Sequence, residues 1–104
     1  MTTFDELQKM VDEYCSVRQP RYFGPLSIHA RLTEEVGEFA REVNDRHGDK
    51  KKRSDELKGS DLVEAADILF TLTCYLNSQN LTWEEGIRLM MEKYKFRDAD
   101  RFKK

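Results

Sequence analysis

Apolar side chains recur at intervals of three and four residues in four segments of the chain, and the segments are bounded by residues typical of helix ends. The alternation of apolar and polar residues expected for strands extends over no useful length. The pattern therefore predicts an all-α fold, in which four main helices form a bundle within one domain spanning residues 1–104. The expected helices cover about residues 4–18, 25 to 45 or 46, 60 to between 78 and 80, and 83–97.

Short capping sequences set several of these helix boundaries. Residues 3–6 and 82–85 both match the capping box, in which a threonine side chain and a glutamate side chain cap each other's backbone amides. Ser60 suits the N-cap of the third helix, and a start near Ser54 also fits the sequence. Residues 47–59 are polar, charged and flanked by glycines, so we expect a mobile loop between the second and third helices.

The third helical segment, LVEAADILFTLTCYL at residues 62–76, is apolar nearly all round, which is typical of a buried helix. Glu64 and Asp67 nevertheless share one sector with Thr71, about 60° wide. A buried carboxylate is costly unless something compensates it, so the two acids suggest a binding site for a cation. Three short neighbours are a poor cover for so apolar a helix. We therefore expect the bundle to dimerise through helix faces, the alternative being burial wholly within the monomer core.

Composition narrows the possible partners. Charged residues make up 37% of the 104 residues, yet the net charge is only −2, so no overall field would attract nucleic acid. The best basic run, at residues 50–53, is flanked by acids. No apolar stretch approaches the length of a membrane span, and the N-terminus does not resemble a signal peptide. Cys15 and Cys74 form neither a disulfide framework nor a zinc motif. We expect a cytoplasmic protein with reduced thiols and no nucleic-acid or membrane partner.

The second helix carries three carboxylates within two turns. Glu35 lies at the edge of the apolar stripe, Glu38 lies further round on the same side, and Glu34 lies outside them. These like charges repel one another, and Arg31 offers only partial relief to Glu35. Gly37 costs about 1 kcal/mol relative to alanine inside a helix, so its position suggests close approach by another helix or a ligand.

Two helices thus each present a pair of acids with a spacing of three residues, which places both members on one helix face. If the helices pack antiparallel, four carboxylates converge, and such oxygen ligands suit Mg²⁺, with Mn²⁺ as a substitute. Either pair alone is also typical of a solvated helix surface, and it is their combination that favours a metal site. The expected ligands are Glu35, Glu38, Glu64 and Asp67.

The sequence Glu34-Glu35-x-x-Glu38, followed after 25 residues by Glu64-x-x-Asp67, resembles the signature of the MazG-like, all-α nucleotide pyrophosphohydrolases. The likeness covers most of the chain from Tyr22 to Phe102. Within this family, the chain is similar to the short single-domain bacterial branch. It extends to the segments YFGPL at 22–26, ARLTEEVGE at 30–38 and DILF at 67–70.

This resemblance implies a helical core that dimerises, often into tetramers, and hydrolyses nucleoside triphosphates between the α and β phosphates. The expected products are a monophosphate and pyrophosphate, with clearance of non-standard nucleotides as one expected role. By position, Glu35, Glu38, Glu64 and Asp67 would be Mg²⁺ ligands, and Glu34 would orient neighbours or activate water.

The remaining roles in such a reaction need other groups. A carboxylate not fully engaged with metal can take a proton from water, and Glu38 or Glu34 is the candidate. Lys93 and Arg97, which share a helix face with Arg101, are expected to hold the leaving pyrophosphate, and the resemblance places basic residues there too. The alternative is that Lys93 and Arg97 are ordinary surface residues of the last helix. The candidates for reading the base, each with a structural role as its alternative, are Tyr22, Phe23, His29, Asn77 and Trp83.

Three other functions compete with this interpretation. A di-metal oxidase bundle would need Glu-x-x-His pairs, which the sequence lacks. A phosphoribosyl-ATP pyrophosphatase-like enzyme is the nearest rival among enzymes. A non-enzymatic helical oligomerisation or regulatory module would carry the acids only as surface charges, and Mg²⁺ would not stabilise it.

Overall fold

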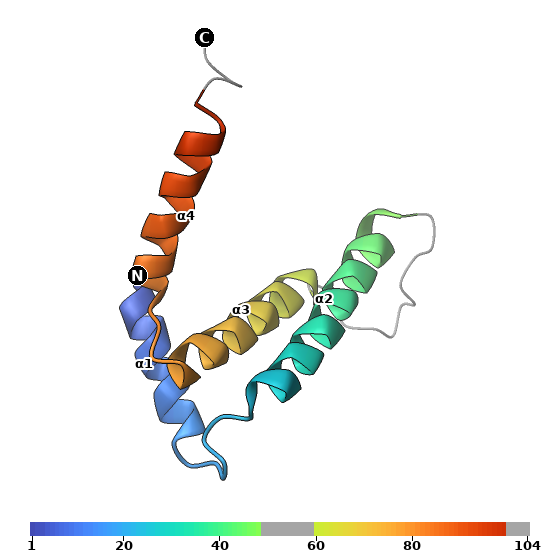
Figure 1. Cartoon of the computed structure of the whole chain (residues 1–104). Helices are drawn as coiled ribbons and strands as arrows, with labels where there is room; N and C mark the ends of the chain where they lie inside the picture. The colour runs from blue at the N-terminus through green and yellow to red at the C-terminus, as the bar shows by residue number, and fades with distance from the viewer. Residues whose placement is uncertain (49–59, 100–104) are drawn as a thin grey trace.

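The computed structural model describes residues 1–48 and 60–99, and within them every regular element is a helix. Helix α1 spans Phe4–Cys15, α2 spans Pro25–His47, α3 spans Ser60–Ser78 and α4 spans Trp83–Arg97 (Figure 1). The prediction of an all-α chain with four main helices is therefore confirmed. Helix α2 includes His47, the first residue of the loop predicted at 47–59, so the helix ends slightly later than expected. The remainder of that loop from residue 49, the alternative helix start near Ser54, and Arg101 lie outside the described residues.

The capping signals are confirmed in full at α1 and in part at α4. Thr3 and Glu6 form both bonds of the capping box. The Thr82 hydroxyl accepts a bond from the Glu85 amide, but the Glu85 carboxylate binds Arg88 instead of returning the bond. Helix α1 ends three residues earlier than predicted, because the chain turns at residues 16–18 before it reaches the proline at 20.

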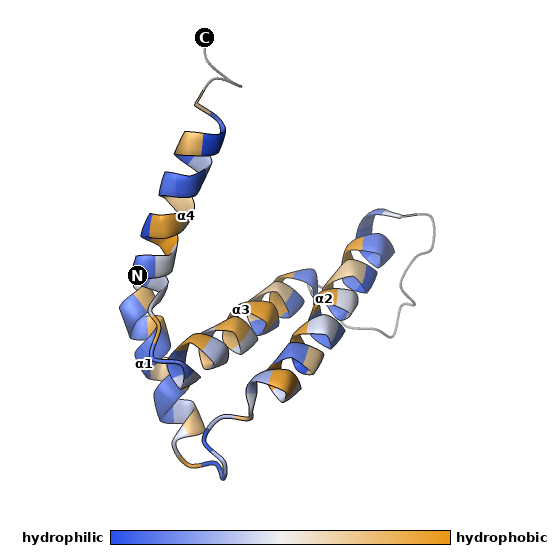
Figure 2. Cartoon of the chain, in the orientation of Figure 1, coloured by the Kyte–Doolittle hydropathy of each residue, from blue (hydrophilic) through white to orange (hydrophobic). Residues whose placement is uncertain are grey.

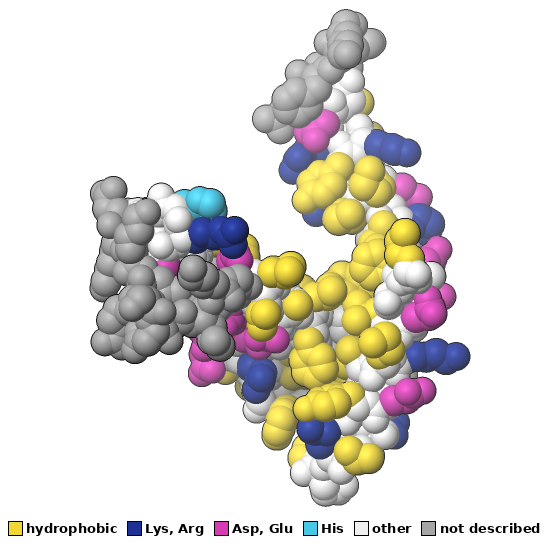
Figure 3. All heavy atoms as spheres, turned by 180° about the vertical axis from the view of Figure 1, so that it is seen from behind, with side chains coloured by type: hydrophobic (Ala, Val, Ile, Leu, Met, Phe, Trp, Pro, Cys, Tyr) yellow, Lys and Arg dark blue, Asp and Glu magenta, His cyan; other side chains and the backbone are white. Residues whose placement is uncertain are grey.

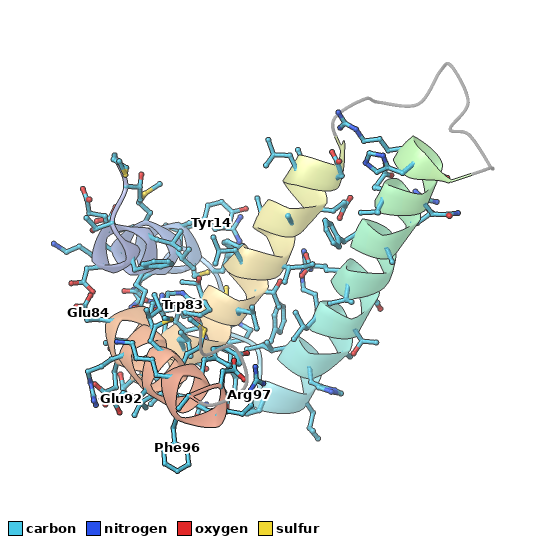
Figure 4. The ribbon with its side chains drawn as sticks, turned by 90° about the horizontal axis from the view of Figure 1, so that it is seen from above. Tyr14, Trp83, Glu84, Glu92, Phe96 and Arg97 are labelled. Carbon is cyan, nitrogen blue, oxygen red and sulfur yellow. The ribbon has the colours of Figure 1, made fainter. Side chains whose placement is uncertain are left out.

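Helices α2 and α3 lie side by side and antiparallel, and they form the most extensive helix–helix contact of the chain (Figures 1 and 4). Arg46 at the end of α2 binds Asp61 at the start of α3, with 3.1 Å between Nη1 and Oδ1. Helix α1 packs against the other half of α3, and α4 packs mainly against α1. The arrangement places the acid-bearing turns of α2 and α3 at one interface.

Polar side chains fasten α1 to the turn between α3 and α4. The Gln8 side chain donates to the Asn77 side chain at 2.8 Å and accepts from the Trp83 backbone amide at 2.9 Å. The Trp83 indole donates to the Thr73 hydroxyl at 2.9 Å. Asn80 ends α3 in the left-handed conformation, with a φ angle of 57°, which asparagine tolerates well. Asn77 and Trp83 are thus engaged in joining helices.

The chain is much more open than a compact domain of its size. Its radius of gyration is 17.1 Å, whereas about 13 Å is typical of 100 residues. Helix α4 extends away from α2 and α3, so the expected bundle is open at this side (Figure 1). Few apolar side chains are fully buried, and Phe96 on α4 is 89% exposed. Hydrophobic residues occur along α3 and at several positions of α4 (Figure 2), and exposed ones include Leu62 and Val63 on α3 and Leu89 on α4.

Seen from behind, hydrophobic side chains gather along the concave surface between α4 and the rest of the chain (Figure 3). Among the described residues, no helix combines the length and the apolar character needed to cross a membrane. Cys15 and Cys74 are free thiols, with their sulfur atoms 4.0 Å apart.

Candidate functional site

Three glutamates of α2 face α3. Glu35, Glu38 and Glu42 have the spacing i, i+3 and i+7, which places them within about 60° of one another on the helix surface. Glu35 is 6% exposed and Glu42 is 7% exposed, so two carboxylates are among the most buried side chains of the chain. Acids are almost never so buried without partners.

Helix α3 repeats the same spacing with Glu64, Asp67 and Thr71, and it runs in the opposite direction. The Thr71 hydroxyl donates a hydrogen bond to Oε1 of Glu35. Further along the interface, Glu38 lies close enough to Glu64 for its negative charge to raise the pKa of the Glu64 carboxyl group. The two helices therefore bring their acidic faces together, as the antiparallel hypothesis requires.

Glu64 is the least compensated member of this group. Its Oε2 atom is buried and has no hydrogen-bond partner. Burial raises the pKa of the Glu64 carboxyl group, and the nearby negative charge of Glu38 raises it further, with smaller effects from Asp67 and Glu42. A buried oxygen without a partner among carboxylates is a position that a cation would stabilise.

This crowding leads to a prediction for the metal-free protein. We expect Glu64→Gln to raise the melting temperature at neutral pH without divalent ions, because it removes one charge from a group of mutually repelling acids. Thermal unfolding in chelator, followed by circular dichroism, measures the change. Glu84→Gln, which alters an exposed glutamate on α4, is the control. A lower melting temperature for Glu64→Gln alone would show that the carboxyl group is needed for stability in its own right.

Glu35 has two cationic or polar neighbours. Thr71 binds one oxygen, and the Nε atom of Arg31 lies 3.7 Å from the other, which confirms the predicted contact one turn earlier on α2. Arg31 itself is largely exposed, so solvent weakens this ion pair. Within residues 1–48 and 60–99, nothing makes the close approach expected at Gly37, because a Cβ atom there would have no neighbour within 4 Å.

A cavity of about 410 Å³ adjoins the acidic interface. Thr71 and Arg31, the two residues that contact Glu35, also line the cavity. Aromatic rings and arginines form much of its wall, a combination suited to stacking against a planar heterocycle and to neutralising anionic groups. The lining residues of these two kinds are Tyr14, Tyr22, Phe23, Phe70, Arg18, Arg21 and Arg31.

Only part of the predicted base-reading set reaches this cavity. Tyr22 and Phe23 line it, whereas His29, Asn77 and Trp83 do not. The Tyr22 hydroxyl donates to Asp12 at 2.5 Å and accepts from Asn77 at 3.1 Å. These bonds hold the Tyr22 ring in the cavity wall.

Lys93 and Arg97 lie away from the acidic turns of α2 and α3 in their own chain (Figure 1). Both lie on α4, whose outer part stands clear of α2 and α3 (Figure 1). Arg97 binds Asp98 at 2.9 Å, and both cations lie against the ring of Tyr94. Figure 4 shows Arg97 on α4 together with Glu92 and Phe96. A role for either residue at the acidic interface would therefore require a second copy of the chain.

Two members of the interface were missed by sequence reasoning. Glu42 received no role, although it follows Glu38 by four residues and so shares its face. Thr71 was placed in the acidic sector but was assigned no function. Glu34, the outer acid of the motif, is exposed, as its position on the helix predicts.

Comparisons with known proteins bear on this site. Residues 23–102 match the sequence model of the MazG nucleotide pyrophosphohydrolase domain. The chain is 44% identical over 100 residues to the uncharacterized protein YpjD of Bacillus subtilis (strain 168), covering 96% of this chain and 90% of that protein. A crystal structure of YpjD from Bacillus subtilis, provisionally described as a pyrophosphatase, aligns with a TM-score of 0.82 and 42% identity, covering 90% and 96% of the two chains.

A second solved structure, the Bacillus-conserved MazG protein described as a nucleotide pyrophosphohydrolase, aligns with a TM-score of 0.79 and 38% identity, covering 90% of each chain. Together with the helical fold and its two facing acidic turns, these similarities define the chain as a nucleotide pyrophosphohydrolase. More specifically, it belongs to the MazG nucleotide pyrophosphohydrolase family.

Enzymes of this family generally depend on a divalent metal ion. Within residues 1–48 and 60–99, no three acidic, histidine or cysteine side chains are close enough together to form a coordination site as they stand. The available donors are nevertheless all carboxylate oxygens, the kind of ligand that Mg²⁺ prefers, and Glu64 contributes a buried oxygen without a partner. The chemistry of these residues fits a divalent cation.

Proposed function

We propose that this chain is a Mg²⁺-dependent nucleoside triphosphate pyrophosphohydrolase that cleaves between the α and β phosphates. The observation that carries the proposal is the meeting of acidic turns from α2 and α3, with Oε2 of Glu64 buried among them and lacking a partner. Mn²⁺ is the expected substitute. The products would be a nucleoside monophosphate and pyrophosphate, and non-standard nucleotides are the proposed physiological substrates.

The acids would divide into two roles. Glu35, Glu38, Glu64 and Asp67 would hold Mg²⁺, which when bound neutralises phosphate charge and orients the polyphosphate. Phosphoryl transfer of this kind depends on positioning and charge neutralisation more than on covalent catalysis.

The proton of the attacking water needs an acceptor. A water oxygen forms the new bond to phosphorus, the bond from phosphorus to the bridging oxygen breaks, and the water proton passes to a carboxylate. Glu38 or Glu34 is the proposed acceptor, because both are exposed on α2 and Glu38 lies near Glu64 of α3.

The nucleoside end of the substrate would enter the adjoining cavity. Its volume of about 410 Å³ is in the range of small-molecule sites, and Tyr22 and Phe23 supply aromatic surface for the base. Because Thr71 and Arg31 belong both to the cavity wall and to the surroundings of Glu35, a bound nucleotide would direct its phosphates toward the acids.

We further propose that the enzyme is a homo-oligomer, a dimer or a dimer of dimers, acting in the cytoplasm. The open shape and the exposed apolar surface of α4 support association with a second copy. Lys93 and Arg97 would then serve the acidic interface of the neighbouring copy, since α4 carries them away from their own α2 and α3. No nucleic-acid or membrane partner is proposed.

The decisive experiment is pyrophosphate release from a panel of natural and damaged nucleoside triphosphates, with phosphoribosyl-ATP included. We expect Mg²⁺-dependent release from triphosphates, and stabilisation by about 2.7 kcal/mol at a Mg²⁺ concentration 100 times its Kd. Thermal unfolding with and without Mg²⁺ measures the second effect. Preferential hydrolysis of phosphoribosyl-ATP would favour the rival enzyme. Absence of both release and stabilisation would favour a non-enzymatic helical module.

A further inference from the structure

We propose that Thr71 is a positioning residue whose hydroxyl group holds Glu35 in the orientation that binds the divalent metal. The inference rests on the proposed function, because it assumes that Glu35 is a metal ligand. Thr71 itself would contact neither the metal nor the reacting phosphate. It would act through Glu35, to which it donates a hydrogen bond across the interface between α3 and α2.

The burial of the two residues makes this hydrogen bond important. Thr71 is 2% exposed and Glu35 is 6% exposed, so water does little to solvate the carboxylate. A desolvated charge requires donors of its own, and hydrogen bonds to ionised groups are the strong ones. Arg31 approaches the other oxygen only to 3.7 Å and is largely exposed. The threonine hydroxyl is therefore the principal buried partner of Glu35.

Orientation follows from this bonding pattern. Glutamate has three rotatable side-chain bonds, and an unrestrained carboxylate would lose that freedom when it binds a metal. The bond from Thr71 restricts the Glu35 side chain beforehand, while Oε2 and the second lone pair of Oε1 are still available as ligands. Groups that orient a metal ligand in this way typically change metal affinity or activity by about 10–100-fold when they are removed.

The same helix supplies a matched control. Thr73 lies two residues further along α3 and is 0% exposed. Its hydroxyl donates to the Leu69 carbonyl at 2.7 Å and accepts from the Trp83 indole at 2.9 Å, so it serves the packing of α4 and not the acids. Equivalent substitutions at the two positions separate loss of a buried threonine from loss of the bond to Glu35.

The experiment compares Thr71→Val and Thr71→Ser with Thr73→Val. Calorimetry with Mn²⁺ in the absence of nucleotide gives the metal affinity, and the Mg²⁺ concentration for half-maximal pyrophosphate release gives an independent value. We expect Thr71→Val to weaken both by about 10-fold or more. Thr71→Ser, which retains the hydroxyl, should restore both to within a few-fold of the original chain. Thr73→Val should lower the melting temperature without changing either metal constant.

Each outcome decides a specific point. If the original chain binds Mn²⁺ and releases pyrophosphate but Thr71→Val matches it in both metal constants, the proposed role of Thr71 is wrong and the function stands. If the original chain neither binds Mn²⁺ nor releases pyrophosphate, the function and this inference fail together. Should Thr71→Val not fold, Thr71→Ala and Thr71→Ser give the same comparison, because these two variants differ only by the hydroxyl group.

Discussion

Asp67→Asn and Glu38→Gln are each expected to reduce kcat/KM for pyrophosphate release by about 10²–10³-fold. Both changes keep the shape of the side chain and remove a negative charge from the interface between α2 and α3. The loss should be large because stabilisation by a bound metal acts on charge that develops during the reaction, in a site that excludes much of the water. Initial rates over a range of nucleotide concentrations, repeated at several Mg²⁺ concentrations, are the measurement.

The control for this experiment is Glu84→Gln on α4, an equal change of charge at an exposed residue outside the acidic interface. Circular dichroism should show the same helix content in all three variants. The metal-free melting temperatures of Asp67→Asn and Glu38→Gln should not fall, since both relieve repulsion around Glu64. Full activity in both variants would remove these acids from the mechanism, whatever the outcome for Thr71.

The helices and the acidic motif were predictable because they depend on local rules. A threonine and a glutamate three residues apart form a capping box wherever the backbone begins a helix, and residues 3–6 do so. The three-residue spacing of Glu64 and Asp67 likewise fixes their common face without reference to the rest of the chain. The sequence left open whether α2 and α3 pack antiparallel, and the structure shows that they do.

Other features depend on tertiary contacts, which local patterns do not encode. Thr82 forms only half of the predicted second capping box, because Arg88 competes successfully for the Glu85 carboxylate. The bond between Thr71 and Glu35 depends on which residues of α2 and α3 lie opposite each other. The position of Lys93 depends on the direction in which α4 leaves the turn after α3. Sequence reasoning placed Lys93 on a helix face but did not predict its separation from the acids.

Because Lys93 and Arg97 lie away from the acids of their own α2 and α3, we expect activity to depend on assembly of the chain into an oligomer. Met91→Glu is expected to convert an oligomer into monomers at micromolar concentration and to abolish most pyrophosphate release. Met91 is an apolar residue of α4 that is 45% exposed, and its neighbours Met90 and Tyr94 are 41% and 37% exposed. A charge buried at the centre of an interface typically weakens the free energy of association by at least about 2 kcal/mol. A two-fold symmetric interface would contain the substitution twice.

Sedimentation velocity over a range of concentrations measures the assembly, and the pyrophosphate assay is run on the same samples. Glu92→Lys is the control, because it changes the charge of the adjacent residue on the opposite, polar side of α4. Assembly and activity should fall together in Met91→Glu, since Lys93 and Arg97 are proposed to serve the acidic interface of a second copy. An original chain that is monomeric and fully active would show that one copy suffices, and that the leaving pyrophosphate is held by residues other than Lys93 and Arg97.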